Sequence, residues 1–268
     1  MRIAYIIPSL YRMAPNRVVQ QLVEGMMARG HECHVFYFDP VTTDAIAFPC
    51  RATRISLLRA TDLTGYDVVH THGLRPNLYV WIHGVPRGVK AVATIHSYVF
   101  EEFRFIYGRG LGWIFGHLFV RTLSRHNRVV TLSRDAVDHY AHWIRPSRLT
   151  YCYNGVEEPT VDVPPDADDC RRIRELKGDG VLVANICFFD KIKGLDVLIR
   201  ALALLPAHYR LLLIGNGAED GALQQLAQRL CPGSCALPGA APKGFALPLA
   251  GRCVCADIME RGVLLVDG

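Results

Sequence analysis

Residues 1–38, MRIAYIIPSLYRMAPNRVVQQLVEGMMARGHECHVFYF, contain the pattern that decides the fold. Residues 1–8 are short, β-rich and nearly all apolar, which predicts a buried parallel strand. Residues 18–29 carry apolar side chains at helical spacing, and Gly30 ends this stretch as a C-cap. Because residues 32–38 predict a second strand, the three segments form one β-α-β unit with a right-handed crossover.

The alternation of strands and helices continues along the chain. The further predicted strands cover residues 66–70, 90–96, 128–133, 148–153, 180–186 and 209–214. Predicted helices cover residues 194–205 and 218–230. Strands that alternate with helices indicate an α/β fold with doubly wound parallel sheets.

A change of composition divides the chain into two α/β blocks. The sequence EEPTVDVPPDADD is polar, acidic and rich in proline, and it opens a predicted interdomain linker at residues 157–175. We therefore expect one Rossmann-like domain at residues 1–156 and a second at residues 176–230. Ligands of open parallel sheets bind beyond the carboxyl ends of the strands, so two such edges could face one another across a cleft.

Residues 231–268 differ from everything before them. They are rich in Ala, Gly, Pro and Cys and show neither strand nor helix periodicity, except that residues 262–266 resemble a strand. We expect this segment to be an atypical tail that leaves the second domain incomplete. A shifted reading frame and a native divergent tail are the two explanations of the change.

The composition limits the class of protein and of ligand. The chain has 268 residues, 50% of them hydrophobic, which suits folded domains. Its net charge of +5 suits a phosphate-bearing ligand or an anionic membrane surface. No secretory leader is recognisable, and the apolar stretch at residues 110–120 is too short to cross a bilayer, so we expect a cytoplasmic protein. We expect no nucleic-acid partner, because no finger spacing and no interleaved basic and aromatic strand is present.

Eight segments together resemble one known family. In chain order they are IAYIIPS, NRVVQQLVEGMMARGHECHVF, YDVVHTHG, AVATIHSY, RVVTLSRDAVDHY, YNGV, IKGLDVLIRAL and LLLIGNGAEDGAL. They resemble the retaining glycosyltransferases of family 4 type, which include many lipopolysaccharide and mannosyl transferases and have the two-domain architecture called GT-B. The resemblance implies transfer of a hexosyl group from a UDP- or GDP-sugar to a growing surface glycan, with retention at the anomeric carbon.

The resemblance assigns the donor to loops of the second block. It places the sugar nucleotide against Gly215 and Gly217, where glycine allows close approach of the backbone. It assigns to Lys193 the neutralisation of the leaving diphosphate. Asn185 ends the preceding strand where an arginine is commoner, and Lys191 is the cation that could compensate. An ordinary turn and a pair of solvated lysines are the alternatives. We expect no cofactor and no tightly bound metal, because no pair of aspartates stands at a strand end.

Three histidines end strands of the first block. The resemblance implies that His96 contacts the donor sugar near the reacting carbon, and we predict it as the catalytic residue; a structural role is the alternative. His70 and His72 lie two apart, so their side chains share one face of a strand. We interpret them as acceptor-side or packing residues, with a metal site as the less favoured alternative.

The loop after the first strand departs from the family pattern. Met13 and Ala14 stand where relatives usually carry two glycines, so close approach to a phosphate is in doubt. We keep Arg12, Asn16 and Arg17 of this loop as candidate acceptor-side or phosphate-binding residues, since the two arginines can attract phosphate.

Residues 110–120 include Trp113, Phe115 and Phe119 and are surrounded by four arginines, at positions 104, 109, 121 and 125. One interpretation is a surface helix that lies on the inner face of an anionic membrane, which suits a lipid-linked glycan as acceptor. The other is a core helix with arginines at its ends.

Two other functions remain open. A nucleotide-binding oxidoreductase is disfavoured because no G-x-G-x-x-G motif follows the first strand. A catalytically inactive remnant is the stronger rival. Relatives carry two glutamates separated by seven residues in the second domain, and here only Glu24 and Glu32 have that spacing, in the first block. We therefore expect little or no transferase activity from this chain by itself.

Overall fold

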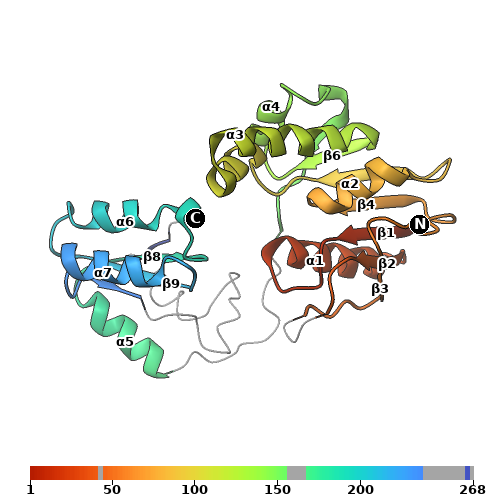
Figure 1. Ribbon diagram of the computed structural model, residues 1–268. Coiled ribbons are helices and arrows are strands. Elements are labelled where there is room, and N and C mark those ends of the chain that lie inside the picture. Colours follow the sequence, from red (N-terminus) through yellow and green to blue (C-terminus); the bar gives the residue numbers. More distant parts are fainter. Residues whose placement is uncertain (42–44, 156–166, 238–262, 266–268) are drawn as a thin grey trace. The chain divides into compact units, whose positions relative to one another are not determined.

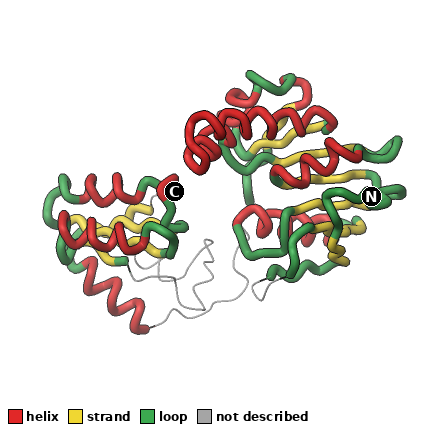
Figure 2. Tube along the Cα trace, in the orientation of Figure 1, coloured by secondary structure: helices red, strands yellow, loops and turns green. Residues whose placement is uncertain are grey.

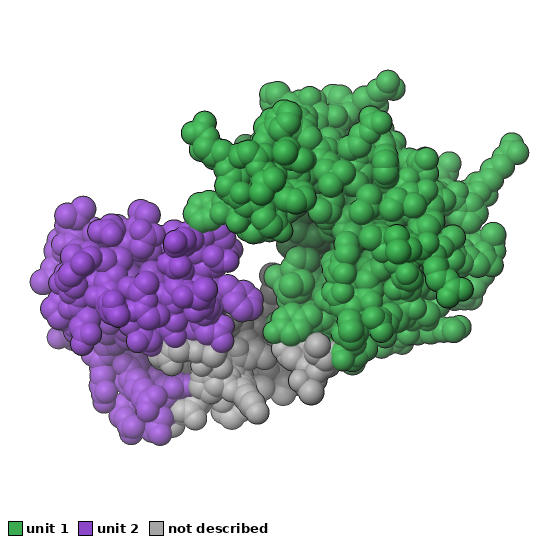
Figure 3. All heavy atoms as spheres, in the orientation of Figure 1, with its two compact units in different colours: residues 1–154 green, residues 155–268 purple. Residues whose placement is uncertain are grey.

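The computed structural model describes residues 1–41, 45–155, 167–237 and 263–265. The chain forms two compact units, Met1–Asn154 and Gly155–Gly268, which Figure 3 distinguishes by colour. Each unit is built on a parallel sheet with helices packed against it, as Figures 1 and 2 show. The predicted α/β class with two Rossmann-like units is confirmed.

The first unit contains a seven-stranded parallel sheet in the order β3-β2-β1-β4-β5-β6-β7. Its strands are β1 (Arg2–Ile7), β2 (Glu32–Tyr37), β3 (Arg51–Arg54), β4 (Val68–His72), β5 (Lys90–Thr94), β6 (Arg128–Thr131) and β7 (Leu149–Tyr151). Its helices are α1 (Ala14–Ala28), α2 (Leu74–His83), α3 (Val99–Thr122) and α4 (Arg134–Tyr140), with 3-10 turns η1 (Leu123–Arg125) and η2 (Pro146–Arg148). From β1 the chain adds β2 and β3 on one side of the sheet, and from β4 it adds β5, β6 and β7 on the other. Sheets of this kind bind ligands where the order switches, which here lies between β1 and β4.

After Arg2, strand β1 is apolar because both of its faces are covered. Tyr5 and Ile7 pack in one cluster with Val19 and Val23 of α1. Ala4 and Ile6, which share the opposite face of the strand, pack with Tyr79 and Val80 of α2. A strand buried on both sides gains from an apolar residue at every position, which explains the continuous run that identified it.

Helix α3 is two helical arms joined at Gly108, whose φ of 79° breaks the helix. The bend can be followed in Figure 2. A Cβ at Gly112 would lie 2.4 Å from the backbone of Arg104, and one at Gly116 would lie 2.3 Å from the ring of Phe100. The absence of side chains at these two glycines therefore lets the arms pack directly against each other.

The second unit contains a four-stranded parallel sheet in the order β10-β9-β8-β11. Its strands are β8 (Val181–Ile186), β9 (Tyr209–Ile214), β10 (Cys235–Ala236) and β11 (Val263–Leu265). Its helices are α5 (Ala167–Lys177), α6 (Leu195–Leu202) and α7 (Asp220–Leu230), with a 3-10 turn η3 (Lys191–Lys193) before α6. One face of the sheet packs with α6 and α7 through Leu211, Leu213, Ile199 and Leu223, and the other packs with Ile173 of α5.

Two sequence assignments differ from the structure of this unit. Residues 167–175, which the sequence analysis places in the linker, belong to α5. Their polar composition is that of a helix exposed on one side, with Ile173 and Leu176 packed against the sheet. Within the predicted tail, β10 pairs with β9 and β11 pairs with residues 182–184 of β8, so the sheet is larger than the sequence indicated. The rest of the linker and residues 238–262 lie outside the described residues.

In the parts of the chain that the structure describes, every helix falls short of the length and hydropathy that a membrane span requires.

Candidate functional site

The carboxyl edge of the first sheet brings the polar residues of several strands together. Strand β1 continues into Pro8 and Ser9, β4 ends at His72, and His96 stands two residues beyond the end of β5. The register pairs His72 with Thr94, so these side chains lie on adjacent strands. This edge is the topological switch point of the sheet, where a ligand site is expected.

The three predicted strand-end histidines form one array, in which His72 is buried and His70 and His96 are partly buried. His72 Nδ1 lies 2.9 Å from His96 Nε2, and His70 Nε2 lies 2.8 Å from Thr94 Oγ1. The rings of His70 and His72 are 4.3 Å apart, and the ring of Tyr5 lies 5.5 Å from that of His70. The structure thus connects His96 to the body of the sheet through His72, a contact that sequence spacing could not indicate.

The histidines of this array are held in the neutral form. Burial lowers the pKa of His70 to about 3 and that of His96 to about 4, and it places the pKa of His72 well below its usual value. Neighbouring histidines lower the pKa of His70 and His72 further, since a second charge would be repelled. His126, which contacts Thr71 on the other face of the sheet at 2.9 Å, also has its pKa lowered by burial, to about 4.

Neutral imidazoles carry one N–H each, which restricts how His72 and His96 can pair. If His72 Nδ1 donates, the proton of His96 must sit on Nδ1, and His96 can then donate to a ligand. If His96 Nε2 donates, the N–H of His72 must sit on its buried Nε2, which has no hydrogen-bond partner among the described residues. Buried N–H groups without an acceptor are rare, so the geometry favours His96 as a donor through Nδ1.

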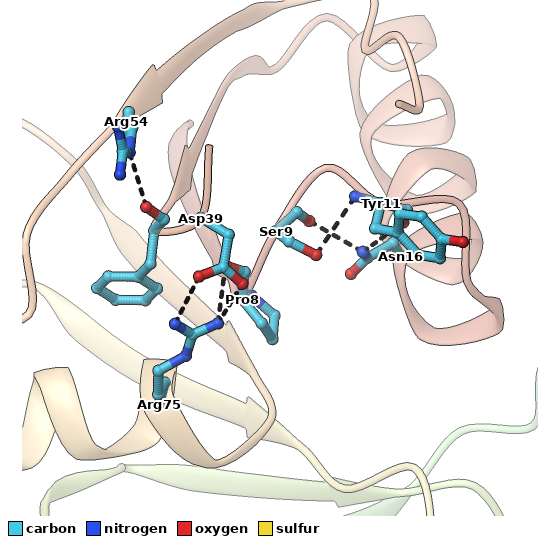
Figure 4. Close-up of polar contacts among 8 residues, drawn as sticks. Pro8, Ser9, Tyr11, Asn16, Asp39, Arg54 and Arg75 are labelled. Carbon is cyan, nitrogen blue, oxygen red and sulfur yellow. Dashed lines mark hydrogen bonds and ion pairs between the residues drawn. The ribbon is translucent and has the colours of Figure 1, made fainter. Parts of the chain in front are cut away.

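The loop between β1 and α1 is held by Asn16, as Figure 4 shows. Asn16 is fully buried, and its Nδ2 donates to the carbonyls of Ser9 at 2.9 Å and Tyr11 at 2.8 Å. The amides of Asn16 and Arg17 are both bonded to the carbonyl of Met13, and Pro15 has no N–H. Few amides at this helix start can therefore reach a phosphate. Arg12 and Arg17 are exposed, whereas Asn16 holds the loop.

An ion pair ties the strand ends next to this loop, and sequence reasoning missed it. Arg75 donates from Nη1 and Nη2 to the two carboxylate oxygens of Asp39, at 2.7 and 2.5 Å, and its Nη2 lies 3.4 Å from the carbonyl of Pro8 (Figure 4). The hydrogen bond from Arg75 lowers the pKa of Asp39. Their positions could have indicated the pair. Asp39 follows β2 and Arg75 lies in the first turn of the helix after β4, so both stand at the carboxyl edge of the same parallel sheet.

In the second unit, Gly215 and Gly217 allow the loop after β9 to pack closely against the loop after β8. A Cβ at Gly215 would lie 1.9 Å from the carbonyl oxygen of Cys187, and one at Gly217 would lie 2.3 Å from that of Phe189. The amide of Phe189 donates to the carbonyl of Asn216 at 2.8 Å. Both glycines are therefore required by packing alone, and contact with a ligand stays a prediction.

The other predicted donor residues share the same carboxyl edge. Lys191 and Lys193 lie exposed in η3, followed by Gly194 in the left-handed conformation that starts α6. Asn185 is buried near the end of β8, and its Oδ1 accepts from Cys187 Sγ at 3.1 Å. Because β8 and β9 are adjacent and parallel, the loops that carry the lysines and the glycines lie side by side. The zinc alternative for His70 and His72 gains no support, since the described residues hold no group of three or more potential ligands arranged for a metal.

Comparisons with known proteins identify the family. The family model described as Glycosyltransferase Family 4 matches residues 15–158, more than half of the chain. Two curated relatives, both O-antigen biosynthesis glycosyltransferases WclY of Escherichia coli, are 29% and 30% identical over 237 residues. Each match covers 82% of this chain and 62% of the relative, so the chain spans less than two thirds of the relatives' length.

Solved structures share the fold at low identity. Sucrose-phosphate synthase from Thermosynechococcus elongatus superposes with a TM-score of 0.70 and 17% identity, covering 100% of this chain and 81% of that one. Anabaena HepE in complex with UDP and glucose superposes with a TM-score of 0.67 and 15% identity, covering 99% and 73%. With the family match, this confirms the resemblance drawn from the sequence: the chain belongs to Glycosyltransferase Family 4.

Proposed function

We propose that the protein transfers a hexosyl group from a nucleoside diphosphate sugar to a hydroxyl of a growing surface glycan of the lipopolysaccharide type. The observation that carries the proposal is the family match, which covers the histidine array at the carboxyl edge of the first sheet. The relatives' role in O-antigen biosynthesis supports the glycan acceptor, and the complex of HepE with UDP and glucose supports a nucleotide-sugar donor.

The donor diphosphate is assigned to the second unit. Lys191 and Lys193 supply positive charge beside the loops of Gly215 and Gly217, and the start of α6 adds the partial positive charge of a helix N-terminus. This charge would stabilise the leaving diphosphate without a tightly bound metal. The metal-free step is checked by transfer or donor binding in EDTA, which we expect to match that without EDTA.

His96 is assigned to the reacting sugar. As a neutral donor through Nδ1 it can hydrogen-bond a sugar hydroxyl without adding a charge, while His72 fixes its tautomer and orientation. We propose retention of configuration at the anomeric carbon, and NMR of the product's anomeric proton tests it.

The place of action in this proposal is the cytoplasm, with peripheral contact at the inner face of the membrane. A lipid-linked glycan acceptor would be held at that surface. The first unit presents exposed arginines, Arg104 and Arg109, on either side of the bend in α3.

The rival proposal is a chain that binds the donor without turning it over. It is favoured by one observation: residues 176–268 contain no two glutamates separated by seven residues. Calorimetric titration with UDP and GDP, and nucleotide release from UDP- and GDP-sugars with a glycan acceptor, separate the two. Binding with turnover supports the transferase, and binding without turnover supports the rival. Affinity for NAD but for neither UDP nor GDP would overturn both.

A further inference from the structure

Large apolar side chains are exposed along one segment of the first unit. Within residues 105–118 the exposed ones are Phe105, Ile106, Tyr107, Leu111, Trp113, Ile114 and Leu118, with Trp113 exposed by 62% and Ile106 by 59%. We call them the α3 surface. Exposed apolar side chains elsewhere stand alone, as Leu58 does, or form a short pair, as Leu204 and Leu205 do. Contiguous exposed apolar surface marks an interaction site, whereas single residues do not.

The fold holds the α3 surface in one shape. Gly108 joins the two arms of α3, and Gly112 and Gly116 let them pack together. The side toward the sheet is anchored, since Val99 and Phe119 belong to the buried core of this unit. Ring contacts run across the arms, with Tyr107 and Phe115 4.8 Å apart. The exposed side chains are thus presented on a hairpin of fixed geometry.

The charges around the α3 surface are positive. Arg104 and Arg109 flank the turn at Gly108 and are exposed, as are Arg121 and Arg125 at the other end of the segment. The acidic residues of α3 lie in its first turn, at the opposite end of the first arm from Gly108. Glu101 is 3.8 Å from His139, and Glu102 accepts a hydrogen bond from Ser97.

Exposed aromatic and aliphatic residues surrounded by arginines match the chemistry of an anionic bilayer surface. Trp, Tyr and Phe rings partition to the level of the headgroups, and arginine stems cover apolar surface while their guanidinium groups reach lipid phosphates. The helices of the described residues cannot span a bilayer, so contact would be peripheral. The sequence alternatives of a surface helix and a core helix are both partly realised, because α3 buries one side and exposes the other.

We propose that the α3 surface docks this protein on an anionic phospholipid bilayer, with Phe105, Ile106, Tyr107 and Trp113 at headgroup depth and Arg104 and Arg109 on lipid phosphates. Helix α3 begins three residues after His96. Docking here would therefore bring the strand end that carries His96 to the membrane, where a lipid-linked acceptor resides. That last consequence rests on the proposed function, whereas the docking itself does not.

The experiment uses Trp113 as the reporter. The chain has three tryptophans, so Trp81→Phe and Trp143→Phe leave Trp113 alone. We expect its emission to shift to the blue, and to be quenched by brominated lipid, on vesicles of phosphatidylcholine with phosphatidylglycerol. Vesicles of phosphatidylcholine alone should bind at least tenfold more weakly, because the arginine contacts are lost.

Matched variants test the surface itself by vesicle co-sedimentation. Ile106→Ser with Tyr107→Ser, and separately Arg104→Gln with Arg109→Gln, should each weaken binding at least tenfold. The control is Leu58→Ser with Leu204→Ser, which removes two apolar side chains exposed by 84% and 88% and should bind as the parent does. Circular dichroism and melting temperature should be unchanged in all three, since the altered side chains are exposed.

Three results with vesicles would overturn the docking proposal: a parent chain that does not bind anionic vesicles, an α3 variant that binds them as the parent does, or a control that loses binding equally. Sedimentation equilibrium without lipid tests whether a second copy of the chain binds the α3 surface instead. A dimer of the parent that the serine variant abolishes would also overturn the docking proposal. UDP and GDP titrations of the same variants keep the two proposals apart. Lost vesicle binding with normal nucleotide binding leaves the proposed function standing.

Discussion

The two units have the same kind of parallel sheet but different interiors. The first contains ten of the chain's eleven histidines, and among them His70, His72, His96 and His126 lie in or beside its sheet. The second is packed mainly by aliphatic side chains together with Phe189, and Asn185 is its one buried polar side chain among the described residues. The described residues of the second unit form a sheet of the same kind without buried imidazoles, so a parallel sheet does not in general require them. Perturbed ionisable groups are commoner at functional sites than elsewhere, which is why the array is the candidate site.

Of the changes considered, lowering the pH should produce the largest difference in stability between the two units. Burial lowers the pKa of His70, His96 and His126 to about 3, 4 and 4, whereas unfolded histidine titrates near pH 6.5. The unfolded state therefore binds protons that the native state excludes. Stability of the first unit falls as pH drops from about 6.5 toward 4 and levels off below the native pKa values. Each proton contributes about 1.4 kcal/mol per pH unit, so three contribute about 4.

Hydrogen exchange at pH 7, 6 and 5, corrected for intrinsic rates and resolved by peptide, measures this difference. Peptides of β4, β5 and β6 should lose protection, while those of β8 and β9 keep it. His208, the histidine of the second unit, is exposed. Equal losses in both units would show that the buried histidines do not control acid stability.

Lys193→Ala is the next largest effect and acts on the second unit. It removes an exposed charge and little packing, so the fold should persist. Loss of one charge-assisted contact should weaken binding of UDP or GDP by about 1.5–3 kcal/mol. Arg229→Ala, at the last turn of α7, is the control because it removes an exposed cation at the other end of a helix. Calorimetry that finds equal affinity in parent and Lys193→Ala would remove Lys193 from the donor site.

Asn16→Ala tests whether the loop after β1 is held by a side chain rather than shaped by glycine. The carbonyls of Ser9 and Tyr11 would lose their donor, which should lower the free energy of unfolding of the first unit by about 1–2 kcal/mol. Arg17→Ala changes an exposed residue of the same helix and should leave stability unchanged. Urea denaturation measures both, and an equal effect of the two substitutions would contradict the role given to Asn16.

His96→Ala should have the smallest effect on donor binding, with little or no change in affinity, because the imidazole is assigned to the sugar and not to the diphosphate. Transfer, in any active form of the protein, should slow markedly. In the parent, ¹⁵N NMR should show His96 protonated at Nδ1 and neutral above about pH 5, in line with its pKa of about 4. A His96 protonated at Nε2 would reverse the pairing with His72. Unfolding of the unit by His96→Ala would show that the residue is structural.

Much of the fold could be predicted because each unit's central strands are apolar on both faces. Strands β1, β8 and β9 were recognisable for this reason, and residues 209–214 match β9 at both ends. Strand β3, RATR, was missed because an edge strand with exposed residues carries no apolar pattern. Helix α5 was assigned to a linker because its apolar residues are few. Strand β11 fell within the predicted strand-like stretch, but its pairing with β8 was not predictable.

By itself, the sequence determined the α/β class, the order of the central elements, the family and the candidate residues, because these follow from local periodicity and from short segments in order. Only the tertiary structure decided what those residues contact. It paired His72 with His96, turned Asn16 inward and set Gly215 and Gly217 against the neighbouring loop. Such contacts join residues far apart in the chain, and strand register and loop packing bring them together, which no local pattern encodes.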